Sequence, residues 1–97
     1  MKIARESLLD VLEEAKRLVA LPGNDFAWSG WEDQKEALGE IDAHILRAKA
    51  RDDSKQLDLQ VLFAPTGPLQ ELSLSSGWSD EFLKLVSRFD TVKNEKA

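Results

Sequence analysis

The chain contains no cysteine, which excludes disulfide bonds, thiolate nucleophiles and cysteine-ligated zinc sites. It also has no long apolar run, so we expect no membrane-spanning segment. The first residues include acidic side chains where a secretory signal requires an apolar stretch. These features favour a cytoplasmic protein that does not contact membranes.

Basic residues are in the minority, with 13 Lys and Arg against 18 Asp and Glu, which gives a net charge of −5. Affinity for nucleic-acid phosphates comes from clustered Lys and Arg, so we expect no nucleic-acid binding. A basic run between Arg47 and Lys55 is interrupted by Asp52 and Asp53 and contains no aromatic residue. Surfaces that bind single-stranded RNA interleave the two residue types. We interpret the run as the solvated end of a helix.

The composition is that of a small globular protein. Apolar residues make up 42% of the 97 residues and charged residues 32%, proportions typical of folded rather than disordered chains. A chain of this length forms one domain with a modest core. We therefore treat residues 1–97 as a single domain.

Three segments show the 3.6-residue apolar period of amphipathic helices, at residues 4–21, 30–50 and 79–92. Ser29 and Glu32 form a predicted capping box before the second helix, and Ser79 is the predicted N-cap of the third. Gly39 lies inside the second helix, where glycine costs about 1 kcal/mol relative to alanine. We expect a neighbouring helix to approach closely there.

The segment between the second and third helices predicts a β hairpin. Alternating apolar residues predict strands at 57–64 and 69–75, joined by a turn at Pro65-Thr66-Gly67-Pro68. Pairing Val61 with Leu72 and Leu59 with Leu74 places these residues on one face and Leu62 on the other. The expected fold is α+β in the order α-α-β-β-α, with a two-stranded antiparallel hairpin packed against three amphipathic helices.

His44, the only histidine, follows Glu36 and Glu40 at four-residue spacing on the second predicted helix. This spacing would place three ligands for a divalent metal on one side of the helix. No second histidine completes the set, and such pairs also arise from ordinary helix surface charge. We therefore expect no metal and no cofactor, with these residues as a weak metal candidate. His44 also lacks a recognisable nucleophile to serve, which favours a protein that is not an enzyme.

Three aromatic residues, Phe26, Trp28 and Trp31, lie within six positions in the connection between the first two helices. Trp31 continues the apolar stripe of the second helix, so we expect it in the core. We expect Phe26 and Trp28 to pack over the core as a lid. The alternative is that they are exposed anchors, because tryptophan is enriched among binding hot spots.

The leading functional hypothesis is a small, acidic, non-enzymatic module that binds a protein partner. Its candidate contacts are the segment Phe26–Trp31 and a hairpin edge, with Leu62 on the outer face. A second hypothesis is a small enzyme or ligand binder that uses Asp and Glu carboxylates in a pocket beside Trp28 or Trp78. A pocket that encloses Glu36, Glu40 and His44 would favour this hypothesis. A third is a self-associating subunit, since a free hairpin edge can pair with a second copy to form a homodimer; a monomer is the equally weighted alternative.

Overall fold

The structure, a computed structural model, describes residues 4–65 and 67–95 and contains five helices and no strand in these ranges. The helices are α1 (Ala4–Val19), α2 (Gln34–Lys49), α3 (Gln56–Leu62), α4 (Pro68–Ser76) and α5 (Ser79–Glu95). The predicted α+β fold is therefore wrong. The protein is all-helical wherever it is described.

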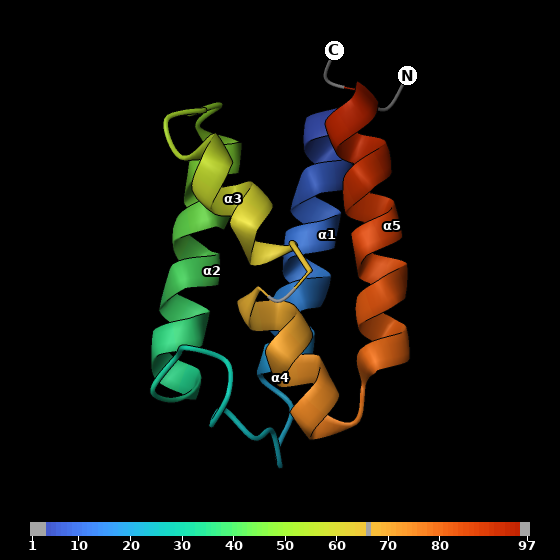
Figure 1. Cartoon of the computed structure of the whole chain (residues 1–97). Coiled ribbons are helices and arrows are strands. Elements are labelled where there is room, and N and C mark those ends of the chain that lie inside the picture. The colour runs from blue at the N-terminus through green and yellow to red at the C-terminus, as the bar shows by residue number, and fades with distance from the viewer. Residues whose placement is uncertain (1–3, 66, 96–97) are drawn as a thin grey trace.

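Three long helices form one layer, in which α1 lies between α2 and α5 and contacts both (Figure 1). The short helices α3 and α4 lie across one face of this layer, and α4 packs against α5. The connection between α1 and α2 lies at the end of the molecule opposite the two termini. The molecule measures 38 × 23 × 20 Å.

The segments predicted to be strands are α3 and α4, because their buried residues follow helical spacing. Leu59, Leu62 and Phe63 are buried at positions i, i+3 and i+4, the spacing of one helix face. Leu57 and Val61, which carried the alternating pattern, are 72% and 51% exposed. The same apolar residues matched both periods, and the prediction used the wrong one.

The ends of α4 carry signals typical of helices. Pro68 occupies the first turn, where its missing amide proton costs no hydrogen bond. Gly77 follows the last turn in the left-handed conformation, with φ of 87°, which glycine adopts without steric cost. A two-stranded hairpin is only marginally stable in isolation, and so are helices of seven and nine residues, so packing against the core decides between the two forms. Thr66, in the predicted turn, lies outside the described residues.

Gly67 forms the tight corner between α3 and α4. Its amide donates to the carbonyl of Ala64 at 2.9 Å, and its own carbonyl accepts from the amide of Glu71 at 3.1 Å. A Cβ atom at this position would clash with the carbonyl oxygen of Val61 and lie 2.9 Å from that of Ala64. Glycine is therefore required by the close approach of the two helix ends.

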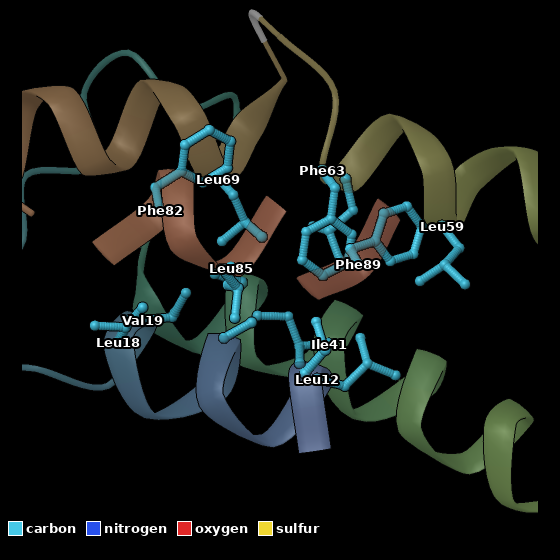
Figure 2. Close-up of a cluster of buried hydrophobic side chains, with 14 of the residues drawn as sticks. Leu12, Leu18, Val19, Ile41, Leu59, Phe63, Leu69, Phe82, Leu85 and Phe89 are labelled. Atoms are coloured by element: carbon cyan, nitrogen blue, oxygen red, sulfur yellow. The ribbon is translucent and has the colours of Figure 1, made fainter. Parts of the chain in front are cut away.

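The core is one apolar cluster to which all five helices contribute (Figure 2). Phe63 and Phe89 stack with ring centroids 4.3 Å apart and an interplanar angle of 13°, which fixes the end of α3 against α5. Leu62, Leu69 and Leu72 are fully buried. The two short helices thus cover the core, the role that was predicted for the hairpin.

The boundaries of the long helices differ from the predicted ones. α2 begins at Gln34 rather than at residue 30, because Asp33 is its N-cap and accepts a hydrogen bond from the amide of Glu36 at 2.9 Å. Glu36 in turn accepts from the amide of Glu32 at 2.6 Å, so a box-like arrangement exists with different partners. α5 begins at Ser79, which is its first helical residue rather than its N-cap.

Candidate functional site

The connection between α1 and α2 is fixed to the rest of the protein by the side chain of Asn24. Its Nδ2 donates to the carbonyl oxygens of Leu18 and Val19, both at 2.9 Å, and so caps the end of α1. Its Oδ1 accepts from Nε1 of Trp78 at 2.8 Å. One amide thereby joins the end of α1 to the residue that precedes α5.

The next residue, Asp25, attaches the connection to α4. Its backbone amide donates to Oγ of Ser76 at 2.9 Å, and its carbonyl accepts from Oγ of Ser75 at 3.0 Å. Its carboxylate accepts from the amide of Ala27 at 3.0 Å, which closes a local turn. The backbone of Asp25 is therefore hydrogen-bonded to α4 through both its amide and its carbonyl.

Ser29 holds the second half of the loop. Its Oγ donates to the carbonyl of Phe26 at 2.9 Å and accepts from the amide of Trp31 at 3.0 Å. Trp31 is buried, as expected, although it precedes α2 instead of lying on it, and its Nε1 donates to Glu40 at 2.9 Å. Phe26 is partly buried against the core. These two aromatic side chains belong to the interior.

Trp28 is different, because 75% of its surface is exposed. The expectation that it packs over the core is wrong, and the alternative of an exposed side chain is correct. It is also the most exposed of the large hydrophobic residues that the structure describes. It lies in the connection between α1 and α2, which Asn24, Asp25 and Ser29 hold by hydrogen bonds.

The other predicted partner contacts, Leu62 and a hairpin edge, depended on a hairpin that the described residues do not form. Leu62 is fully buried in α3, so the prediction that it lies on an outer face is wrong. The described residues contain no strand, and hence no hairpin edge that could add a strand from a partner or from a second copy. Dimerisation by strand pairing loses its structural basis.

The three candidate metal ligands, Glu36, Glu40 and His44, have different surroundings and do not converge on one point. Glu40 accepts from the indole of Trp31, Glu36 accepts from the amide of Glu32, and His44 is buried. Across residues 4–65 and 67–95, no group of three or more His, Asp or Glu side chains is arranged to hold a metal ion. A metal site at these residues is not formed.

A pocket of about 250 Å³ lies where the C-terminal end of α2 meets α1, α3 and the connection between α2 and α3. Ten residues line it: Leu8, His44, Arg47, Ala48, Arg51, Asp52, Asp53, Lys55, Gln56 and Leu59. His44 lies in this pocket, but Glu36 and Glu40 do not. This pocket is therefore not one that encloses all three residues, and Glu36 and Glu40 are exposed.

His44 has only 4% of its surface exposed, and its Nδ1 lies 3.2 Å from a guanidinium nitrogen of Arg47. The guanidinium can only donate, so Nδ1 accepts and the imidazole carries its proton on Nε2. Burial, and then the charge of Arg47, lower the pKa of His44 below its usual value. The ring is held neutral at pH 7.

Sequence reasoning missed this pocket, although a signal for it was present. His44, Arg47, Ala48 and Arg51 follow the i, i+3, i+4, i+7 spacing that places side chains along one side of a helix. The basic run was interpreted as a solvated helix end because Asp52 and Asp53 interrupt it and it contains no aromatic residue. Only the placement of α3 beside the C-terminal end of α2 turns that side of the helix into the wall of a pocket.

Comparisons with protein-family models, with curated proteins and with solved structures give no match for this chain. None of the helices in the described ranges has the length and apolar character needed to cross a bilayer.

Proposed function

We propose that the protein is a non-enzymatic interaction module that binds a protein partner through Trp28. The observation that carries this proposal is a tryptophan with 75% of its surface exposed, on a loop fixed by hydrogen bonds to α1 and α4. Burial of a large apolar ring is favourable, and tryptophan is among the residues most enriched at binding hot spots. The lack of cysteine and of a bilayer-crossing helix in the described chain supports a cytoplasmic setting for this interaction.

The fixed backbone strengthens the case for an anchor. Ordering a flexible loop on binding costs free energy that reduces affinity. Here Asn24, Asp25 and Ser29 already hold the loop in one conformation. A partner would therefore receive the indole at little further entropic cost.

The charge around Trp28 favours a basic partner segment. The connection itself, residues 20–33, has three carboxylates and no lysine or arginine. Asp25, Glu32 and Asp33 are exposed on the loop itself. Such a surface attracts Lys and Arg side chains, which also interact favourably with the face of an indole ring.

The test compares the wild type with Trp28→Ala and with Leu46→Ala as immobilised baits for quantitative capture from lysate. Leu46 is the matched control, because it is 67% exposed and lies near the opposite end of α2. We expect a defined set of basic proteins to be retained by the wild type and by Leu46→Ala. Trp28→Ala should reduce their recovery at least tenfold, since a hot-spot truncation costs about 2 kcal/mol or more.

Equal recovery of every captured protein by Trp28→Ala and the wild type would overturn the proposal. Sedimentation equilibrium at micromolar concentration gives the solution mass of the wild type and of Trp28→Ala. It shows whether the partner is a second copy of the chain. A wild-type dimer that becomes a monomer in Trp28→Ala would assign the indole to self-association instead. Thermal unfolding of both variants should match the wild type closely, because surface truncations are nearly neutral.

A further inference from the structure

We propose that the pocket at the C-terminal end of α2 binds a small organic monocarboxylate with an apolar body. The site is independent of Trp28, which lies in the connection at the other end of α2. Its lining combines three cationic side chains, two carboxylates, a buried histidine and an apolar portion. Each part of this lining constrains the ligand.

The charge of the lining favours a single negative charge on the ligand. Arg47, Arg51 and Lys55 contribute three positive charges, and Asp52 and Asp53 two negative ones, which leaves an excess of one. Both carboxylates already accept local hydrogen bonds, Asp52 from the amide of Ser54 at 2.9 Å and Asp53 from Nε2 of Gln56 at 3.4 Å.

The cationic side chains are less engaged. In the described part of the chain, no ion pair within 4 Å involves Arg47, Arg51 or Lys55. Arg47 contacts Nδ1 of His44, which leaves other guanidinium donors for a ligand. A carboxylate fits a guanidinium in a two-bond arrangement, so it suits this cluster better than a neutral polar group does.

The apolar lining and the volume define the rest of the ligand. Leu8, Ala48 and Leu59 come from three different helices and give the pocket an apolar side. The volume of about 250 Å³ is just below the roughly 300–1,000 Å³ typical of pockets for drug-sized ligands. The ligand is therefore small, of the size of benzoate.

The backbone at Arg51 supports a role for this residue beyond ending the helix. The amides of Arg51 and Asp52 donate to the carbonyls of Ala48 and Arg47 at 3.2 and 2.8 Å, which is the hydrogen-bond pattern of a Schellman motif. Arg51 has φ of 58°, in the left-handed position where glycine is usual. An arginine held there at a conformational cost places a guanidinium at the pocket.

Two-dimensional NMR titration with sodium benzoate tests the proposal, with benzamide and inorganic phosphate as parallel probes at equal ionic strength. We expect saturable shifts at the amides of residues 44–59 with benzoate, and binding at least tenfold weaker with neutral benzamide. Phosphate that binds as tightly as benzoate would overturn the carboxylate assignment. Benzoate shifts that do not saturate, or that spread evenly over all basic residues, would overturn the site.

Three variants locate the binding. Arg51→Gly removes the guanidinium while relieving the left-handed backbone, so it should fold at least as stably as the wild type and bind benzoate at least fivefold more weakly. Arg47→Gln should weaken binding similarly. Lys49→Gln is the control, because Lys49 belongs to the same basic run but does not line the pocket. Equal loss in Lys49→Gln, or unchanged binding in Arg51→Gly, would contradict the assignment.

Discussion

His44 shows how one buried polar side chain can make stability depend on pH. The imidazole is buried and lies beside the guanidinium of Arg47, and both the burial and the charge oppose its protonation. The carboxylates of Glu40 and Asp58 act in the opposite direction but more weakly. The unfolded chain, in which a histidine has a pKa of about 6.5, therefore binds the proton more readily than the folded protein does.

We predict that the free energy of unfolding falls as the pH is lowered from about 7.5 to 5.5, through the pKa of an unfolded histidine. Because the pKa of His44 is lower in the folded protein, the unfolded chain takes up a proton first as the pH falls. Folding stability is therefore highest above the pKa of the unfolded histidine and decreases below that value. Urea unfolding followed by tryptophan fluorescence measures the effect. His44→Gln should flatten the pH dependence in this window, and an equal slope in both proteins would contradict the prediction. The lowered pKa values of Asp52 and Glu14 affect stability only at lower pH.

Trp28 and Leu62 show which residue-level properties the sequence left open. Trp28 was expected to pack over the core and Leu62 to lie on an outer face, yet Trp28 is 75% exposed and Leu62 is fully buried. Hydrophobicity alone does not separate them. The exposure of Trp28 depends on how Asn24 and Asp25 fix the loop, which involves partners more than 50 positions away in the sequence.

At the scale of elements, the two glycines Gly39 and Gly67 have opposite roles. Gly39 lies within α2, is exposed, and has no atom within 4 Å of where a Cβ would stand. The expected close approach of a neighbouring helix is therefore wrong. Nothing in its surroundings requires a glycine.

Gly39→Ala should raise the free energy of unfolding by about 0.5–1 kcal/mol, since alanine loses less conformational entropy in a helix and meets no clash. Chemical denaturation of the variant and the wild type measures the change directly. A Gly39→Ala variant that is less stable than the wild type would contradict the open surroundings of this position.

The same substitution at the corner should have the reverse effect. Gly67→Ala places a methyl group against the carbonyl oxygens of Val61 and Ala64, which are backbone atoms and cannot rotate away. We expect a loss of about 1–3 kcal/mol, typical of overpacking in a close-packed region. Denaturant midpoints of the two Gly→Ala variants should move in opposite directions, and a neutral Gly67→Ala would contradict the geometry of the corner.

At the scale of the whole molecule, Asn24 connects parts of the chain that are distant in sequence. Its amide makes three hydrogen bonds, to the carbonyls of Leu18 and Val19 and to the indole of Trp78. It thereby fixes the end of α1, the Trp28 loop and the start of α5 relative to one another. No local sequence pattern predicts this set of partners.

Asn24→Ala should lower the free energy of unfolding by about 2–4 kcal/mol, since each of three hydrogen bonds contributes about 0.5–1.5 kcal/mol. The exposed Gln60→Ala is the control and should remain within about 0.5 kcal/mol of the wild type. Amide hydrogen exchange provides the second readout, with faster exchange expected in the loop of residues 20–33. Unchanged stability together with unchanged loop exchange would contradict the role of Asn24.

The sequence by itself determined the three long helices, because each carries an apolar stripe over about three turns that no strand period matches. It also determined the burial of Trp31 and the exclusion of cysteine chemistry. The tertiary structure alone decided the form of residues 56–76, where short apolar segments fit both the two-residue and the 3.6-residue period. Their packing against α5, through the stack of Phe63 on Phe89, selects the helical form. The pocket and the exposure of Trp28 were likewise decided by contacts between elements, which a one-dimensional pattern does not contain.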